Sequence, residues 1–321
     1  MTDITDYSPK GVLKNKHLLT LKDYSAEEIY EILLLAAQEK KRYKSGVKND
    51  ALKGKILAMI FSKSSTRTRL SFEAGMIQLG GYPMFLNASD MQLGRNEPLS
   101  DTARVISRMG IDGIMIRTYD QKDVEELAAY GGVPVINGLT DLYHPCQVLA
   151  DLLTVYERFG RLRGLKLAYI GDGNNMANSY MIGCAKLGID VSIVGPKEYA
   201  PQKDITDYAK TQGTVTVTED ITRGVSGADV ICTDVFFSMG QEKDKSKERL
   251  LTPYQVNDEL MKKTGKDSTI FLHCLPAHRG EEVTASVIDG KQSFVFDEAE
   301  NRLHAQKAVM LLLLGQKSIS N

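Results

Sequence analysis

The sequence lacks most features that mark secreted, membrane-spanning or nucleic-acid-binding proteins. Its four cysteines lie far apart and form no C-x-x-C pair, which argues against a zinc ribbon or a dense disulfide framework. The longest apolar stretch, residues 308–314, is far shorter than the roughly 20 residues that a membrane span needs. The formal net charge is −1, so a phosphate-bearing partner must be met by local groups rather than by a basic face. These absences favour a small-molecule ligand.

The composition fits a globular protein large enough for two domains. Of its 321 residues, 42% are hydrophobic and 25% are charged, and this length corresponds to two domains of roughly 150 residues each. The first residues form neither a basic stretch followed by an apolar core nor an Arg-rich, acid-poor segment, which are the marks of secretory and organellar signals. We therefore expect a cytoplasmic protein with reduced thiols.

Short apolar runs rich in β-branched residues alternate with amphipathic stretches along the chain. This alternation is typical of parallel sheets covered by helices on both faces, so the predicted fold class is α/β. A helix is predicted over residues 145–159, and the domain boundary is placed near this helix. The predicted strands occupy residues 56–61, 113–116, 133–136, 166–170, 191–194, 230–233, 269–273 and 294–296.

Residues 65–68 read Ser-Thr-Arg-Thr, between the first predicted strand and a helical run over residues 70–79. A helix N-terminus offers free backbone N–H groups, hydroxyls add donors, and an Arg adds charge and a forked donor pair. The pattern favours a phosphate site. An ordinary Ser/Thr helix cap beside a surface Arg gives the same pattern, and the motif alone does not choose between the two.

Further polar residues fall where predicted strands end, which is the edge where open α/β sheets place ligand crevices. Arg117 follows an apolar strand and either pairs with an exposed carboxylate or acts as a second phosphate ligand. His144 precedes a helix, and Gln147 lies one turn inside it. A neutral imidazole there can donate to an oxygen that becomes negative in a transition state, and the amide can accept from an N–H₂ group. His144 as a plain helix cap is the alternative.

A strand followed by Gly171-Asp-Gly173 supplies half of a dinucleotide-binding fingerprint. Met176 occupies the place of the third glycine, which permits close packing of helix on strand, and this weakens a nicotinamide interpretation. Asn174 and Asn175 instead offer neutral amides that can grip the carboxylate or ammonium of an amino acid.

The second half of the chain carries further chemical groups. Asp234 and Ser238 place a carboxylate and a hydroxyl beyond a strand, which suits an amine substrate. The charged residues 241–249 predict a mobile, solvated loop in a position that suits a lid. Residues 273–282 hold two His and one Cys, but no partner pair lies at zinc-site spacing, so we predict no metal there.

Four motifs in this order resemble the ornithine carbamoyltransferase family over nearly the whole chain. They are Ser-Thr-Arg-Thr-Arg at 65–69, His-Pro-Cys-Gln at 144–147, Ser-Met-Gly at 238–240 and His-Cys-Leu-Pro-x-His-Arg-Gly-Glu-Glu at 273–282. The first two would fit any carbamoyltransferase, including the aspartate enzymes, whereas the last two resemble the ornithine branch. The absence of Trp argues against the acetylornithine relatives, which use a Trp in their substrate pocket.

The resemblance implies two doubly wound parallel-sheet domains joined by interdomain helices. Domain 1–150 would bind carbamoyl phosphate, with a C-terminal helix at 306–321 packing back on it, and domain 151–305 would bind ornithine. Carbamoyl transfer to the δ-amine would give citrulline and phosphate, as part of arginine metabolism, without a cofactor or metal. The competing functions are transfer to putrescine or another amine, a silent carbamoyl-phosphate sensor, and a nicotinamide-dependent oxidoreductase.

The same resemblance assigns roles to residues of this chain. Arg117 would bridge the phosphate and the carbamoyl oxygen, His144 would also donate to that oxygen, and Gln147 would hold the carbamoyl N–H₂. Cys274 and Leu275 would lie beside the reacting amine, with a cis peptide after Leu275. The catalytic residues would be Arg117, His144, Asp234 and Cys274, and the carbamoyl-phosphate-binding residues would be Ser65, Thr66, Arg67, Thr68, Gln92, Arg117, His144, Gln147, Cys274, Leu275 and Arg302.

Ornithine-binding residues and an oligomer also follow from the resemblance. Asn175 and Met239 would meet the carboxylate end of ornithine, and Asp234 and Ser238 would meet its α-amino group. Gln92 matches a family residue that reaches the phosphate bound by a neighbouring subunit, so the site would need a homo-oligomer, in the family built from trimers. Neither nucleic acid nor a membrane is an expected partner.

Overall fold

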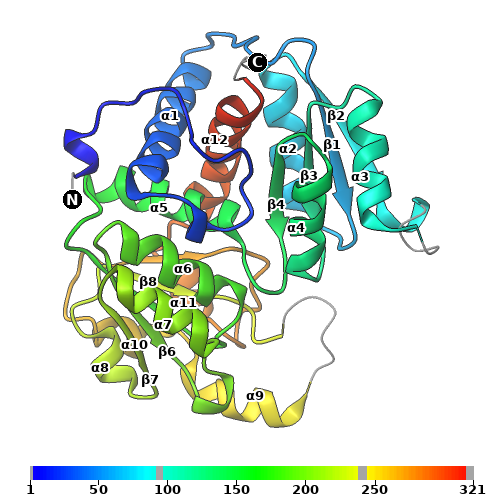
Figure 1. Ribbon diagram of the computed structural model, residues 1–321. Coiled ribbons are helices and arrows are strands. Elements are labelled where there is room, and N and C mark those ends of the chain that lie inside the picture. The colour runs from blue at the N-terminus through cyan, green and yellow to red at the C-terminus, as the bar shows by residue number, and fades with distance from the viewer. Residues whose placement is uncertain (1–2, 92–96, 238–243, 316–321) are drawn as a thin grey trace. The chain divides into compact units, whose positions relative to one another are not determined.

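The chain divides into two α/β units, each built on its own parallel sheet (Figure 1). One unit holds residues 6–153 and the residues from 300 onward, and the other holds residues 154–299 with residues 3–5. This computed structural model describes residues 3–91, 97–237 and 244–315. Two parallel-sheet units are what the alternating sequence pattern predicts, so the predicted fold class is confirmed.

The N-terminal unit has four parallel strands in the order β2-β1-β3-β4. Helices α3 and α4 cover one face, where Ile60, Ile106 and Leu127 belong to one buried apolar cluster. Helix α2 lies on the other face with α12 beside it, because a Cβ added to Gly75 would come within 2.9 Å of Met310. The elements are α1 (Ala26–Lys44), β1 (Ile56–Phe61), α2 (Thr66–Gln78), β2 (Tyr82–Asn87), α3 (Leu99–Arg108), β3 (Gly113–Arg117), α4 (Gln121–Tyr130), β4 (Val135–Leu139), α5 (Pro145–Phe159) and α12 (Val295–Leu314).

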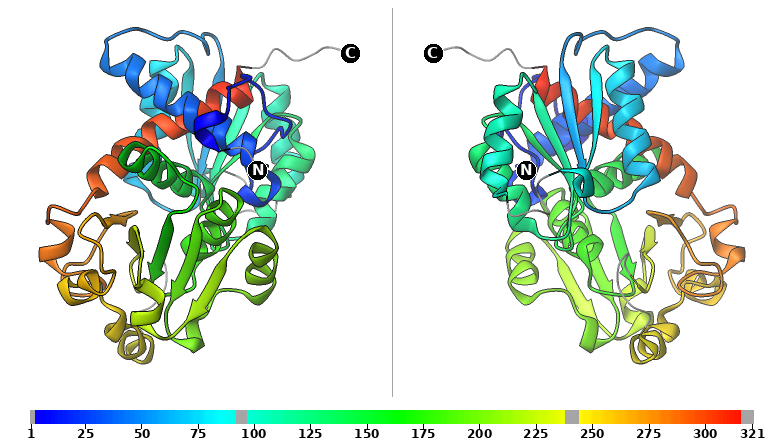
Figure 2. Two further views of the ribbon diagram at one scale, coloured as in Figure 1. Left: turned by 90° about the vertical axis from the view of Figure 1, so that its left-hand side faces the viewer. Right: turned by 90° about the vertical axis from the view of Figure 1, so that its right-hand side faces the viewer.

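The C-terminal unit has five parallel strands in the order β7-β6-β5-β8-β9, with helices on both faces of the sheet (Figure 2). One face packs α8, α10 and α11 onto a buried cluster that includes Ile170, Ile231 and Phe271. Helices α6 and α7 lie side by side on the other face. The elements are β5 (Lys166–Ile170), α6 (Asn175–Lys186), β6 (Asp190–Val194), α7 (Lys203–Gln212), β7 (Val215–Thr218), α8 (Ile221–Val225), β8 (Val230–Thr233), α9 (Lys245–Leu251), α10 (Asp258–Lys262), β9 (Ile270–His273) and α11 (Ala285–Ile288).

Each sheet has one point where the strand order reverses, and such points hold the ligand crevice in open α/β sheets. In the N-terminal unit the reversal lies between β1 and β3, so the residues after Phe61 and the terminal Arg117 share one edge. In the C-terminal unit it lies between β5 and β8, so the residues after Ile170 and Thr233 share one edge. The polar motifs of the sequence fall at these two edges.

Near the C-terminal end of the chain, one predicted strand is wrong and one predicted helix is described only in part. Residues 294–296 were predicted as a strand, but α12 begins at Val295, because a three-residue apolar run carries no period and Asp297 and Glu298 suit the first turn of a helix. The predicted C-terminal helix at 306–321 is the second half of α12, which ends at Leu314. Residues 316–321 lie outside the described residues.

A buried charged cluster joins α1 and α12 within the N-terminal unit. Lys40 donates to Asn301 at 2.8 Å, and Lys307 lies 3.3 Å from Glu39. His304 is fully buried beside them, 3.6 Å from Glu300, and its ring lies 5.9 Å from that of Tyr43. Burial and the charge of Lys40 lower the pKa of His304 to about 4.

The lowered pKa of His304 predicts a loss of stability at acidic pH. The unfolded chain takes up a proton at His304 near pH 6.5, whereas the folded chain does so only near pH 4. Acidification through this window therefore favours unfolding, by up to about 3 kcal/mol. We expect His304→Gln, which cannot titrate, to show a smaller drop in urea-unfolding free energy between pH 7 and pH 4.5. Equal drops in both proteins would contradict this account.

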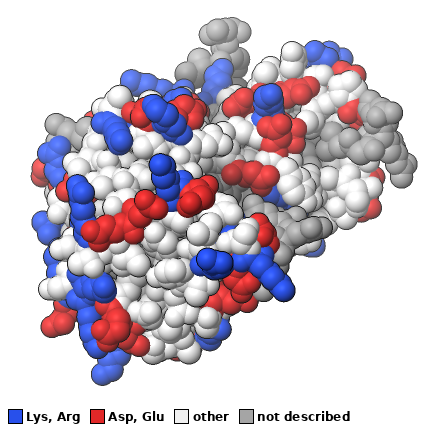
Figure 3. Space-filling model, turned by 90° about the horizontal axis from the view of Figure 1, so that it is seen from below, with Lys and Arg blue, Asp and Glu red and all other residues white. Residues whose placement is uncertain are grey.

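The surface shows no concentration of one charge on the face drawn in Figure 3. Lys and Arg lie among Asp and Glu there, in keeping with the net charge of −1. Among the described residues, no helix combines the length and apolar character needed to cross a bilayer.

Candidate functional site

The N-terminus of α2 begins directly after β1 and is capped by its own serine. Ser65 has extended backbone angles, and its side chain accepts a hydrogen bond from the Thr68 N–H at 3.2 Å. Thr66 and Arg67 follow as the first helical residues, Thr66 exposed and Arg67 half-buried. The backbone N–H groups of this turn and the positive helix end favour an anion. The structure confirms the serine cap, and the phosphate site at the same helix end stays a prediction.

Thr68 accepts hydrogen bonds from two buried arginines. Its Oγ1 accepts from Arg302 at 3.3 Å and lies at the 3.5 Å limit of a hydrogen bond from Arg117. The second amino group of Arg302 donates to Gln147 Oε1 at 2.6 Å. Thr68, Arg117, Gln147 and Arg302 are all less than 10% exposed. Four of the predicted site residues, separated by up to 234 positions, thus form one polar cluster.

His144 lies buried near these arginines, directly before α5. Burial, together with the positive charges of Arg302, Arg117 and Arg67, holds the pKa of His144 well below its ordinary value of 6.5. The imidazole is therefore neutral near pH 7 and can donate one N–H without adding charge. This is the state that the sequence analysis required for a donor to a carbonyl oxygen.

Sequence reasoning missed two buried residues of this unit, Asp151, which supports the cluster, and Lys63. Asp151 accepts from Gln147 Nε2 at 2.8 Å, which orients the amide so that its oxygen faces Arg302. Lys63, between β1 and α2, is buried, pairs with Asp141, and has its ammonium 4.0 Å from the Tyr119 ring centre. The spacing of Gln147 and Asp151, one helical turn apart, is a signal that could have identified the first pair.

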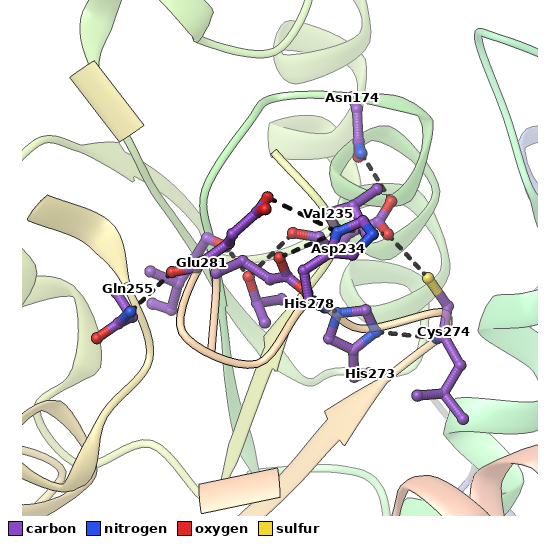
Figure 4. A network of polar contacts seen from close by, with 12 residues as sticks. Asn174, Asp234, Val235, Gln255, His273, Cys274, His278 and Glu281 are labelled. Carbon is purple, nitrogen blue, oxygen red and sulfur yellow. Dashed lines mark hydrogen bonds and ion pairs between the residues drawn. The ribbon is translucent and has the colours of Figure 1, made fainter. Parts of the chain in front are cut away.

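In the C-terminal unit, Asp234 binds three groups at the end of β8 (Figure 4). Its Oδ1 accepts from the Cys274 thiol at 3.1 Å and from the Val235 N–H at 2.8 Å, and its Oδ2 accepts from Asn174 at 2.9 Å. Asp234 and Cys274 are both partly exposed. The structure therefore brings together two predicted residues that lie 40 positions apart.

Asn174 was given no role by the family resemblance, which assigned ornithine binding to the neighbouring Asn175. Its Oδ1 caps α6 by accepting from the N–H groups of Met176 at 2.9 Å and Ala177 at 3.3 Å, while its amide holds Asp234. Asn175 is the first helical residue and is half-buried. An Asn directly before a helix is a cap signal, and this signal was available in the sequence.

The turn between β5 and α6 packs closely against a later segment of the same unit. A Cβ on Gly173 would lie 2.2 Å from the Pro201 nitrogen, so this glycine serves close packing of the chain on itself. The first N–H groups of α6 already donate to Asn174 rather than remaining open for a pyrophosphate. The nicotinamide interpretation is not favoured.

The segment 241–249 was predicted to be a mobile, solvated loop. Its described part is mostly exposed, as predicted, but it is helical, so the loop assignment is wrong there. Residues 245–251 form α9, which Asp244 caps through the Ser246 N–H at 2.8 Å. Lys247 is buried and pairs with Asp172 at 2.6 Å. Charge alone suggested exposure, but a Lys with a buried carboxylate partner can lie against the protein. Residues 241–243 lie outside the described residues, as do Gln92, Ser238 and Met239.

After β9 the chain turns sharply at Leu275, and the peptide between Leu275 and Pro276 is cis, as predicted. Two groups of side chains near this turn have possible metal-ligand atoms within 4.8 Å of one another, as a metal site requires. The first group is Asp234, His273 and Cys274, and the second is His278, Glu281 and Glu282. In the first group both ring nitrogens of His273 already hydrogen-bond, to the Leu275 N–H at 2.9 Å and to Glu282 at 3.1 Å. We therefore assign it no metal.

Two family models together match most of the chain. Residues 16–157 match the carbamoyl-P binding domain of aspartate/ornithine carbamoyltransferase, and residues 163–313 match the Asp/Orn binding domain. The divide between the matches falls close to the boundary of the two units at residues 153 and 154.

Relatives and solved structures named as ornithine carbamoyltransferases match nearly the whole chain. An ornithine carbamoyltransferase of Carboxydothermus hydrogenoformans is 57% identical over 94% of this chain and 98% of the relative. The structure of the Pyrococcus furiosus ornithine carbamoyltransferase has a TM-score of 0.90 at 51% identity, covering 94% of this chain and 98% of that one. The anabolic ornithine carbamoyltransferase of Campylobacter jejuni has a TM-score of 0.87 at 39% identity, covering 94% and 100%.

Proposed function

Because this chain belongs to the aspartate/ornithine carbamoyltransferase family, we propose that it transfers the carbamoyl group of carbamoyl phosphate to the δ-amine of ornithine. The observation that carries the proposal is the cluster in which Arg117 and Arg302 meet on Thr68 at the N-terminus of α2. The products are citrulline and phosphate, and the reaction belongs to arginine metabolism in the cytoplasm. The free state of all four cysteines is in keeping with a reducing compartment.

Carbamoyl phosphate binds the N-terminal unit in this proposal. The phosphate lies at the start of α2, held by backbone N–H groups, the hydroxyls of residues 65–68 and the guanidinium groups of Arg67 and Arg302. Arg117 reaches both the phosphate and the carbamoyl oxygen. The neutral His144 donates to the same oxygen, and Gln147 accepts from the carbamoyl N–H₂.

Ornithine binds the C-terminal unit in this proposal. Asp234, held by Asn174 and Cys274, takes the α-ammonium, and residues at the start of α6, Asn175 among them, face the carboxylate. Ser238 contributes at the α-ammonium, and Met239 contributes at the carboxylate. Cys274 and Leu275 lie beside the δ-nitrogen.

The chemistry requires a neutral amine and a stabilised oxygen. The δ-ammonium, whose pKa resembles the roughly 10.4 of Lys, first loses a proton. The free amine then forms a bond to the carbamoyl carbon, and the bond from that carbon to the phosphate oxygen breaks, with its electron pair leaving on phosphate. The attacking nitrogen loses its extra proton to the leaving phosphate, which gives neutral citrulline. Arg67, Arg117 and His144 stabilise the charge that develops on the carbonyl oxygen and on the leaving phosphate. The two substrates must be brought together for this step.

An acceptor panel tests the proposal. Purified protein is incubated with carbamoyl phosphate and with ornithine, putrescine, lysine or aspartate, and both the carbamoylated product and phosphate are measured. We expect kcat/KM to be highest for ornithine. A higher value for putrescine would identify the rival amine transferase, and binding of carbamoyl phosphate without any turnover would identify a sensor.

We also propose a homotrimer in which Gln92 of one subunit completes the phosphate site of the next. Support comes from apolar side chains exposed around the edge of the N-terminal sheet. Leu70 and Ile77, on the same face of α2, are 60% and 63% exposed, and Tyr82 on the edge strand β2 is 62% exposed. Large apolar side chains gathered on adjacent elements are typical of an interface.

Complementation between inactive variants tests this shared site. Light scattering should give three times the 35.5 kDa mass of the chain. We expect Gln92→Ala and Arg67→Ala each to be nearly inactive, and co-expression of the two to restore activity, because some sites then combine an intact Arg67 with an intact Gln92. Failure to regain activity in mixed oligomers of confirmed composition would contradict a shared site.

A further inference from the structure

Leu275, which directly follows Cys274 of the candidate ornithine site, holds an unfavourable backbone conformation. Its φ of 54° makes it the one non-glycine residue with positive φ in the part of the chain that the structure describes. A side chain with a Cβ avoids this region unless its surroundings hold it there. The neighbouring contacts should therefore include groups that fix this residue.

His273 fixes Leu275 through a hydrogen bond across two residues. The Leu275 N–H donates to His273 Nδ1 at 2.9 Å, so Nδ1 carries no proton. The ring proton is then on Nε2, which lies 3.1 Å from Glu282 Oε1 and donates to it. Both side chains are fully buried, so water does not compete for these contacts.

Glu282 closes the turn by holding both of its ends. Its Oε1 accepts from His273 Nε2 and also from the His278 N–H at 2.6 Å. Burial alone would raise the pKa of Glu282, but the hydrogen bonds from His273 and the His278 N–H outweigh it and lower the pKa. The group is therefore a carboxylate near pH 7, suited to accept from two donors.

The last residue of β9, directly before the turn, is also held through its backbone. The His273 N–H donates to Glu298 Oε2 at 2.8 Å, so the histidine is held at its backbone and at both ring nitrogens. Between the anchored His273 and His278 lie Cys274, whose thiol faces Asp234, and Leu275. The orientation of both residues follows from the histidine and glutamate behind them.

We propose that His273 and Glu282 are positioning residues that hold the Leu275 backbone and the Cys274 thiol in the orientation needed for carbamoyl transfer. This inference rests on the proposed function of the site. Both side chains are fully buried, so they act through the residues of the turn rather than on the substrate itself. The histidine acts as a neutral spacer with one acceptor and one donor, and the glutamate fixes which ring nitrogen carries the proton.

Paired substitutions separate the acceptor role from simple space filling. His273→Ala removes the acceptor for the Leu275 N–H, whereas His273→Asn places an amide oxygen near the position of Nδ1. Glu282→Ala removes the acceptor for two donors, whereas Glu282→Gln keeps an oxygen there. We expect both alanine variants to lose at least tenfold in kcat with little change in the ornithine KM, because Asp234 and Asn174 are untouched. The Asn and Gln variants should recover much of this loss.

Thr269→Val is the matched control. Thr269 is buried immediately before β9, and its hydroxyl donates to the Ala228 carbonyl at 2.8 Å, away from Leu275. Its loss should lower the thermal midpoint as a buried hydrogen-bond deletion does, while kcat stays near wild type. A His273→Ala protein that is destabilised to the same degree yet keeps wild-type kcat would overturn the proposal. Equal kcat losses in His273→Ala and His273→Asn would also overturn it.

A readout that does not need activity separates this inference from the proposed function. Nitrogen NMR of ¹⁵N-histidine-labelled protein, with the His273 signals identified by their loss in His273→Asn, should show a neutral ring protonated at Nε2. Glu282→Ala should shift these signals, and Thr269→Val should not. A His273 ring protonated at Nδ1 would refute the arrangement. Correct signals in a protein that carbamoylates no ornithine would instead refute the proposed function.

Discussion

Asp234→Ala is expected to remove the preference for acceptors that carry an α-ammonium. Deleting one partner of a hydrogen-bonded charge pair costs about 3 kcal/mol, so kcat/KM for ornithine should fall on the order of a hundredfold. The informative comparison is 5-aminopentanoate, which keeps the δ-amine and carboxylate of ornithine but lacks its α-amine. The wild-type protein should strongly prefer ornithine, and Asp234→Ala should handle the two acceptors nearly alike.

Putrescine and a second aspartate supply the controls for this experiment. Putrescine lacks only the carboxylate, so its turnover should also fall in Asp234→Ala. Asp207 is exposed on α7 of the same unit and pairs with Lys203, so Asp207→Ala should keep wild-type kinetics. An unchanged ratio of ornithine to 5-aminopentanoate in Asp234→Ala would move the α-ammonium contact to another residue.

Arg67→Ala is expected to reduce kcat/KM for carbamoyl phosphate by about a hundredfold while the fold remains intact. The guanidinium would contact the phosphate, and a charge-assisted contact that strengthens in the transition state is typically worth about 3 kcal/mol. Steady-state kinetics measures the fall in kcat/KM, and calorimetry with carbamoyl phosphate measures the loss of affinity that accompanies it. Near-native values for both would place the phosphate elsewhere.

Arg104→Ala is the matched control for Arg67→Ala. Arg104 is exposed on α3 of the same unit and pairs with Asp101 at 3.0 Å, so its removal deletes the same side chain without reaching the α2 N-terminus. We expect its kinetics and thermal midpoint to stay close to wild type. A loss equal to that of Arg67→Ala would mean that net charge, rather than position, determines the effect.

The sequence predicted the buried strands, including the buried edge strand β9, better than the partly exposed strands. Strands such as β1, β5 and β8 are buried nearly throughout and read as continuous apolar runs, which is how parallel strands covered on both faces appear. The missed strands β2 and β7 are edges of their sheets and are partly exposed. Pro83 further weakens the strand signal of β2, although a proline is tolerated at an edge.

The predicted site residues share one physical basis, since polar groups at the ends of parallel strands gather at one edge of a sheet. This rule located Arg117 and Asp234 without the structure. It could not identify Glu282 as the partner of His273, because their contact depends on the shape of an irregular turn. Lys247 was wrongly placed in solvent for a similar reason, since its partner Asp172 lies 75 positions away.

The contacts of Asn174 restrict which amino acids that position can accept. Asn, Asp, Ser and Thr all cap helices well, but this position must also donate to the Asp234 carboxylate. Aspartate would satisfy the helix and place a second carboxylate against the first, whereas serine and threonine are too short to span both contacts. Substitutions at 174 and 234 should therefore be non-additive, and a variant selected for a different acceptor through position 234 would have to change both residues together.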